Sequence, residues 1–175
     1  MTSAPVIRAP VVRAWVAIGG NIEPARRLPH AARLLKARFP GIVFSPVFRN
    51  PAEGFEGEDF LNAVAGFDTE LAIGPLREAL HAIEAACGRA RDDAKWAPRA
   101  MDIDLLLYGE HVGPSEAGEL PRKDLLRRDY MLGPLAALAP TVVHPLAGRT
   151  IGELWRERAG LPHRLERLAL DLNAG

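Results

Sequence analysis

The chain has 175 residues, of which 48% are hydrophobic and 25% are charged, a composition typical of one globular domain and not of a disordered segment. Its 22 Lys and Arg residues balance its 22 Asp and Glu residues, so no overall field favours nucleic acid or an anionic membrane, and any anion site must be local. The single cysteine, Cys87, excludes an intrachain disulfide, and no apolar run has the length of a signal peptide or a membrane span. We therefore expect a cytoplasmic protein with a flexible N-terminal extension over residues 1–10.

The first part of the chain predicts the order strand, helix, strand, strand. An apolar run over residues 11–18 predicts a strand, which a turn over residues 19–21 ends. Helical spacing follows, and Pro29 predicts that the regular helix begins near that residue. Residues 42–48 and 60–67 predict two further strands, separated by a loop rich in Gly, Pro and acidic residues.

The second part adds a helix, a strand and C-terminal helices. The helix ends at Gly88 and carries an apolar stripe made of Leu76, Leu80, Ile83 and Cys87. With a strand from Asp102, the order becomes β-α-β-β-α-β, that of an α+β, ferredoxin-like sheet with helices on one face. Residues 130–138 and 151–158 predict additional helices. We expect a single domain over residues 11–160 and a C-terminal tail over residues 161–175.

The strand that begins at Asp102 carries two acidic residues. Alternation along a strand places Asp102, Asp104 and Leu106 on one face and residues 103, 105 and 107 on the other. A carboxylate pair inside a strand is costly unless something compensates its charge. Mg²⁺ held together with substrate phosphates would do so, and so would ion pairs with nearby arginines such as Arg99. The pattern alone leaves both interpretations open, as well as that of a solvated strand end.

The loop before this strand is cationic. Its basic and acidic residues are Arg89, Arg91, Lys95 and Arg99 against Asp92 and Asp93. Guanidinium groups match phosphate oxygens, so the loop fits a polyphosphate site, although a solvated loop has the same composition. Trp96 in this loop either folds over a ligand or anchors the loop to the body of the protein.

A second candidate surface lies on the strand over residues 60–67. Phe60 and Asn62 are two residues apart and therefore share a face, where a ring and an amide could meet a flat heterocycle. The alternative is a core phenylalanine beside a strand-edge asparagine. The sequence contains no P-loop pattern and no transition-metal spacing, and Cys87 on its helical stripe is expected in the core.

Five motifs occur in an order that resembles one family. They are A-W-V-A-I-G-G-N (14–21), F-R-N-P (48–51), F-L-N-A (60–63), G-R-A-R (88–91) and W-A-P-R-A-M-D-I-D-L-L-L-Y-G (96–109). Over residues 13–158 the chain resembles the 6-hydroxymethyl-7,8-dihydropterin pyrophosphokinases of folate biosynthesis. The resemblance implies a ferredoxin-like α+β fold and an enzyme that transfers the β,γ-pyrophosphoryl group of ATP to the pterin hydroxymethyl oxygen, releasing AMP.

The same resemblance implies roles for individual residues. Two Mg²⁺ ions are expected at the aspartates, and the expected catalytic set is Arg89, Arg99, Asp102 and Asp104. Expected contacts to ATP involve His81, Glu84, Arg91, Trp96, Arg99, Leu105, Arg122 and Arg128. Expected contacts to the pterin involve Asn50, Pro51, Phe60, Asn62 and Tyr130, with Phe60 and Tyr130 sandwiching the ring.

Four positions depart from the family pattern. Gly20 stands in place of a common Ser, Asn50 in place of Thr, His81 in place of Gln, and Arg122 in place of the His that follows a Pro. These departures leave open a paralogue that acts on a related modified pterin, or a non-catalytic regulator that binds a pterin or nucleotide. A ferredoxin-like RNA binder is a third alternative, disfavoured because the chain has no net positive charge. We expect a monomer with small-molecule substrates and with neither nucleic-acid nor membrane partners.

Overall fold

The computed structural model describes residues 10–52, 54, 56–88, 100–158, 160–161 and 164–175. Its sheet has the strand order β5-β1-β4-β3-β6, with β2 also paired to β4, and the paired strands are antiparallel. The elements in chain order are β1 (Val12–Gly20), α1 (Pro24–Arg38), β2 (Val43–Phe44), β3 (Val47–Asn50), β4 (Phe60–Thr69), α2 (Ile73–Ala86), β5 (Asp102–Tyr108), α3 (Asp124–Arg127), α4 (Asp129–Leu138), α5 (Ile151–Arg156) and β6 (Glu166–Leu168).

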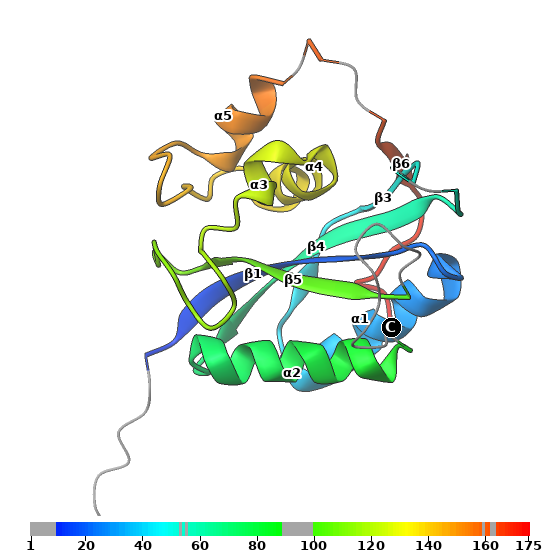
Figure 1. Cartoon of the computed structure of the whole chain (residues 1–175), viewed down its shortest axis with the longest axis horizontal. Coiled ribbons are helices and arrows are strands. Elements are labelled where there is room, and N and C mark those ends of the chain that lie inside the picture. The colour runs from blue at the N-terminus through cyan, green and yellow to red at the C-terminus, as the bar shows by residue number, and fades with distance from the viewer. Residues whose placement is uncertain (1–9, 53, 55, 89–99, 159, 162–163) are drawn as a thin grey trace, which may run out of the picture.

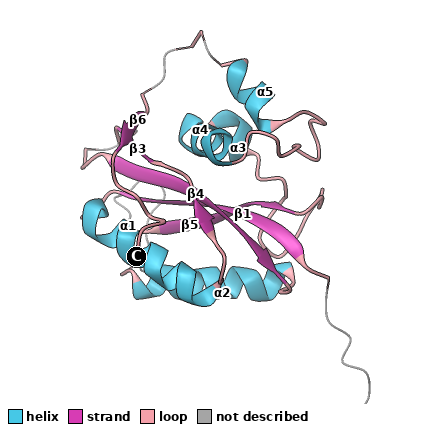
Figure 2. Ribbon diagram, turned by 180° about the vertical axis from the view of Figure 1, so that it is seen from behind, coloured by secondary structure: helices cyan, strands magenta, loops and turns pink. Residues whose placement is uncertain are grey.

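The sheet separates two layers of helices. Helices α1 and α2 cover one face, and α3, α4 and α5 lie on the other (Figures 1 and 2). Each face has its own apolar cluster, because successive residues of β1 alternate between them: Val16 packs beneath α1 and α2, whereas Trp15 and Ala17 pack beneath α4. The predicted ferredoxin-like α+β fold with additional C-terminal helices is confirmed. In the described part of the chain, no helix has the length and apolar character that crossing a membrane requires.

Two element boundaries near the N-terminus differ from the prediction. Gly19 and Gly20, predicted as a turn, are the last residues of β1, because they pair across the sheet with Asn62 and Leu61. Helix α1 begins at Pro24, five residues before Pro29. Pro24 stands at the start of the helix, where a proline loses no intrahelical hydrogen bond. Pro29 lies inside α1, so it does not mark the beginning of the helix.

The region predicted as one strand over residues 42–48 forms two short strands, β2 and β3. Ser45 and Pro46 separate them. The main-chain N–H of Ser45 donates to the carbonyl of Val64 at 2.8 Å, and the Ser45 hydroxyl accepts from the N–H of Val64 at 2.9 Å. A side-chain oxygen therefore replaces a main-chain acceptor at this point, which ends the regular ladder.

Strand β5 alternates as predicted up to Leu106 and then deviates. The register with β1 shifts between Val16 and Trp15, so that Leu105 pairs with Val16 but Leu107 pairs with Trp15. This irregularity leaves Leu106 as an additional residue, as in a β-bulge. Leu107 consequently joins Leu106 in the apolar cluster beneath α4, and its predicted placement on the opposite face is wrong.

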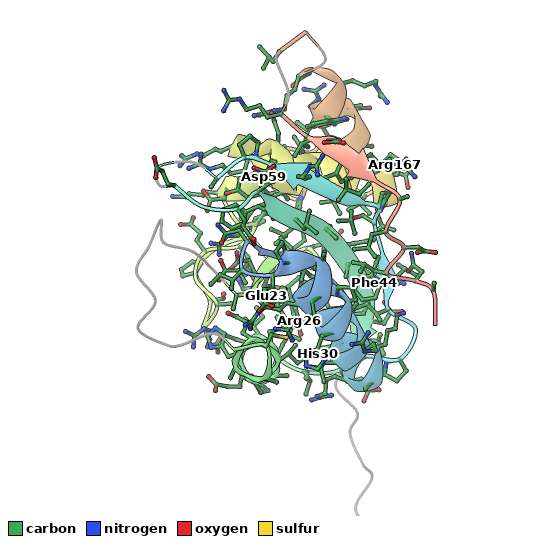
Figure 3. All side chains as sticks on the ribbon, turned by 90° about the vertical axis from the view of Figure 1, so that its right-hand side faces the viewer. Glu23, Arg26, His30, Phe44, Asp59 and Arg167 are labelled. Carbon is green, nitrogen blue, oxygen red and sulfur yellow. The ribbon has the colours of Figure 1, made fainter. Side chains whose placement is uncertain are left out.

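Residues that were expected to form a C-terminal tail pack against the sheet. Strand β6 pairs with β3, and Figure 3 shows Arg167 on this strand. Leu172 is 3% exposed and belongs to the cluster beneath α1 and α2. The side-chain amide of Asn173 accepts from the main-chain N–H of Phe44 at 2.9 Å and donates to its carbonyl at 3.0 Å. The end of the chain thus adds hydrogen bonds to β2.

Candidate active site

One row of paired residues crosses four strands of the sheet. Phe48 of β3 pairs with Asn62 of β4, Asn62 pairs with Gly19 of β1, and Gly19 pairs with Asp102 of β5. Directly paired residues project to the same face of a sheet. Neighbouring strands lie about 4.8 Å apart, so the backbones of Asn62 and Asp102 are separated by about 10 Å across one surface.

Gly19 makes room for the Asn62 side chain. A Cβ atom at Gly19 would lie 2.1 Å from the Oδ1 atom of Asn62 and 3.2 Å from its Cγ atom. The Asn62 amide therefore lies across β1 and donates through Nδ2 to the Oδ1 atom of Asn50. Asn50 and Asn62 are 8% and 7% exposed, and the Nδ2 atom of Asn50 donates to the carbonyl of Pro51 at 3.3 Å. Three of the predicted pterin residues thus form one hydrogen-bonded group.

The two predicted aromatic residues come from different layers. Phe60 is the first residue of β4, pairs with Asn50 and lies on the same face as Asn62. Tyr130 is in the first turn of α4, which packs over β4 and β3 on that face. Both side chains are partly exposed, as aromatic rings that bind a ligand need to be.

Asp104 shares its face with Asp102 and lies near a cation. It pairs with Ala17, which belongs to the apolar cluster beneath α4. The Arg122 Nη1 atom is 3.9 Å from the Oδ1 atom of Asp104, and its Nη2 atom is 3.6 Å from Asp124 Oδ2. The Nε atom of Arg122 is buried and has no hydrogen-bond partner among the described residues. The Arg122 side chain as a whole is 34% exposed, so an anion beside the carboxylate pair can reach this cation.

The other predicted nucleotide residues lie on α2, on β5 and between α3 and α4. On α2, Glu84 is buried and its Oε1 atom is 3.9 Å from the Nε2 atom of exposed His81. Leu105 is 5% exposed in the cluster beneath α1 and α2, so its side chain points away from the carboxylates. Arg128 stands between α3 and α4, and its main-chain N–H donates to the carbonyl of Asp124 at 2.8 Å.

Part of the predicted site lies outside the described residues: Arg89, Arg91, Trp96 and Arg99. Helix α2 ends at Ala86 and is followed by Cys87 and by Gly88, whose φ of 91° is a left-handed conformation that favours glycine. Cys87 is buried, and this burial raises the pKa of its thiol. A protonated thiol in the core has no nucleophilic role, in agreement with the interpretation of the helical stripe.

Gly19 and Asp124 contact predicted site residues, although the local sequence does not indicate either of them as part of a site. The contact of Gly19 with Asn62 depends on the register between β1 and β4, and that of Asp124 depends on the path of the chain after β5. Neither is a local property of the sequence. The one available sequence signal is the Gly19-Gly20 pair at the end of an apolar run, because glycine inside a strand often marks a site where another group approaches the backbone closely.

The two aspartates fit a hard divalent cation. Among the residues that the structure describes, no group of three or more His, Cys, Asp and Glu side chains could hold a metal ion. Mg²⁺ in nucleotide enzymes is typically bound through one or two carboxylates, with waters and substrate phosphates as the other ligands. Asp102 and Asp104 provide this donor set on one surface.

Comparison with known proteins supports one family. A model of the 7,8-dihydro-6-hydroxymethylpterin-pyrophosphokinase (HPPK) family matches residues 15–140. The chain is 36% identical over 148 residues to a 2-amino-4-hydroxy-6-hydroxymethyldihydropteridine pyrophosphokinase of Pseudomonas aeruginosa, covering 82% of this chain and 90% of that protein. It is 38% identical over 148 residues to the protein of that name from Methylorubrum extorquens, covering 82% and 91%.

A solved structure shares the fold. It is the crystal structure of a Plasmodium falciparum HPPK-DHPS variant with STZ-DHP, which matches with a TM-score of 0.73 at 11% identity. The match covers 94% of this chain but 50% of that one, so this chain spans about half of its length. At this identity the likeness supports the fold alone.

Proposed function

The chain belongs to the 7,8-dihydro-6-hydroxymethylpterin pyrophosphokinase family, and on this premise we propose how its residues perform that reaction. The enzyme transfers pyrophosphate from ATP to the hydroxymethyl group of 6-hydroxymethyl-7,8-dihydropterin in folate synthesis. The pterin oxygen forms a bond to the β-phosphorus, the bond from this phosphorus to the α,β-bridging oxygen breaks, and the hydroxyl proton is released. AMP is the leaving group.

The row across the sheet carries this assignment. Asn62 at one end and Asp102 at the other are separated by about 10 Å at their backbones, a span suited to a bicyclic pterin with its hydroxymethyl arm. A pterin whose polar edge meets the amides would present its hydroxyl group beside the carboxylates. The same surface then brings the acceptor oxygen to the phosphates that a carboxylate-bound cation would hold.

The pterin end of the site would recognise the ring by its flat shape and by the hydrogen bonds along its polar edge. Asn50 and Asn62 hold each other in one orientation, so the amide atoms not used in their mutual hydrogen bond can face the polar edge of the ring. Phe60 from the sheet and Tyr130 from α4 supply the two aromatic faces. Pro51 continues the loop at this edge.

The phosphate end concentrates opposite charges. Asp102 and Asp104 would hold Mg²⁺, which when bound neutralises phosphate charge. Arg122 replaces the family histidine with a permanent cation, and its partly exposed position beside Asp104 supports a role in phosphate binding. We assign Arg89 and Arg99 to stabilising charge during transfer.

Other residues complete the proposed nucleotide contacts: Arg91, Trp96, His81, Glu84, Leu105 and Arg128. The buried side chain of Leu105 restricts its contact to main-chain atoms. We further propose two Mg²⁺ ions per active site, a monomeric enzyme and a cytoplasmic location. Metal titration in the presence of an ATP analogue and light scattering would test the first two.

The decisive assay incubates the full chain with ATP, MgCl₂ and 6-hydroxymethyl-7,8-dihydropterin and separates AMP from ADP. Multiple turnovers that form AMP are expected. ADP formation would indicate transfer of a single phosphoryl group and contradict the proposal. Ligand binding without turnover would indicate a regulator, and a strong preference for another pterin would indicate a paralogue.

The carboxylates are tested by Asp102→Asn and Asp104→Asn, which keep side-chain shape and remove charge. Each should lower AMP formation by at least about 100-fold, since metal-assisted charge stabilisation contributes several kcal/mol, while circular dichroism stays unchanged. Asp68→Asn is the matched control, because Asp68 is six residues from Asn62 along β4 and forms an exposed pair with Arg13 at 2.7 Å. Near-normal turnover in either site variant would contradict the assignment.

A further inference from the structure

The joint between α3 and α4 carries two of the proposed ligand contacts. Helix α3 ends at Arg127, α4 begins at Asp129, and Arg128 between them is extended, with φ −115° and ψ 119°. Arg128 and Tyr130 therefore project from a turn of a few residues. The carbonyls at the end of a helix have no intrahelical partner, so the orientation of this turn depends on what else binds it.

Arg158 binds this joint at three points. Its Nε atom donates to the Oδ1 atom of Asp129 at 2.6 Å, its Nη1 atom donates to the carbonyl of Leu126 at 2.8 Å, and its Nη2 atom donates to that of Arg127 at 3.3 Å. The two carbonyls belong to the end of α3, whereas the carboxylate belongs to the first turn of α4. One planar guanidinium thus joins both helices.

The segment that carries Arg158 follows α5, and α5 packs against α4. Helix α5 lies beside α3 and α4 (Figures 1 and 2). It approaches α4 closely at Gly133, where a Cβ atom would lie 3.0 Å from the ring of Trp155. The main-chain N–H of Arg158 donates to the carbonyl of Trp155 at 3.0 Å. Contacts of α5 therefore fix the origin of the Arg158 side chain.

We propose that Arg158 is a positioning residue for substrate binding, acting through the α3–α4 joint on Tyr130 and Arg128. This inference rests on the proposed function of those two residues. It also extends the site to a segment outside residues 15–140, the part of the chain that the family model matches. Exposed ion pairs contribute little, but the Arg158 and Asp129 side chains are only 25% and 26% exposed. Lysine cannot reproduce the three directed contacts of the guanidinium.

The first test compares Arg158→Met and Arg158→Lys with a control, Arg149→Met. Arg149 lies before α5 and pairs with Glu153 and Glu157, so its loss removes a cation from the same region without removing a contact to the joint. Pterin affinity is measured by calorimetry with a non-hydrolysable ATP analogue and Mg²⁺. We expect a loss of about tenfold in Arg158→Met, a partial loss in Arg158→Lys, and none in the control.

A double-mutant cycle separates positioning from general destabilisation. In a Tyr130→Ala background, Arg158→Met should cause a much smaller loss of pterin affinity, because the pterin contact that Arg158 positions is absent. An equal loss in both backgrounds would overturn the proposal, as would unchanged affinity in Arg158→Met.

A second readout does not depend on pterin binding. Hydrogen exchange of main-chain amides over residues 126–132 should accelerate in Arg158→Met, and also in Asp129→Asn, but not in Arg149→Met. Unchanged exchange in the first two variants would overturn the inference. If the unmodified protein fails to bind the pterin, the proposed function is wrong, while the exchange measurement still decides whether Arg158 holds the joint.

Discussion

Replacing Gly19 by alanine should impair pterin binding although it removes no polar group. The new Cβ atom would lie 2.1 Å from the Oδ1 atom of Asn62. Contacts this short do not occur in packed proteins, so the amide must retreat by at least about 1 Å. That movement breaks the hydrogen bond between Asn62 and Asn50, whose side chains are both buried.

The size of the effect follows from that bond. A buried polar group left without its partner costs about 1–3 kcal/mol, so the free energy of unfolding should fall by that order. A misplaced Asn62 would also lose the directed contact proposed for it with the pterin. At about 1.4 kcal/mol for each tenfold change, an equal loss lowers pterin affinity by about 10- to 100-fold.

Calorimetry with pterin and urea unfolding together test this reasoning. The double variant Gly19→Ala with Asn62→Ala is the control, because it removes the amide atoms that clash. It should recover part of the stability lost in Gly19→Ala while its pterin affinity remains low. Wild-type affinity and stability in Gly19→Ala alone would refute the idea that Asn62 needs the space above Gly19.

Three further predictions concern the scaffold and are measured by urea unfolding. Burial lowers the pKa of His144, whose Nδ1 atom accepts from two main-chain N–H groups at 3.0 and 3.3 Å. The unfolded chain therefore binds a proton that the folded protein excludes, so stability should be greatest above about pH 6.5 and decrease as the pH falls below it. His144→Asn should reduce this pH dependence, and an unchanged slope of unfolding free energy against pH in the variant would contradict the prediction. Thr150→Ala should lower the free energy of unfolding by about 1 kcal/mol, because the Thr150 hydroxyl caps α5 by accepting from the N–H of Glu153 at 3.2 Å. Thr150→Ser keeps the hydroxyl, so an equal loss of stability in that variant would argue against capping. Asn173→Ala should cost about 1–3 kcal/mol by removing both hydrogen bonds to Phe44, with AMP formation unchanged; undiminished stability would show that these bonds contribute nothing.

Local patterns predicted much of the fold. Period-two alternation placed Asp102 and Asp104 together on one face of β5, and helical spacing found α2 with its glycine end. The same rules failed where a contact with another strand intervened. Leu107 changes face because β5 and β1 shift register, and Gly19 continues β1 because it pairs with Asn62.

The sequence by itself determined the family, the common face of the two aspartates and the candidate aromatic and amide residues, because these depend on residue type and on spacing within one segment. Only the tertiary structure decided that Asn62, Gly19 and Asp102 form one row, that Arg122 lies beside Asp104, and that Arg158 binds the α3–α4 joint. These contacts join segments far apart in the chain. Strand register and helix packing create them, and neither is encoded in a local pattern.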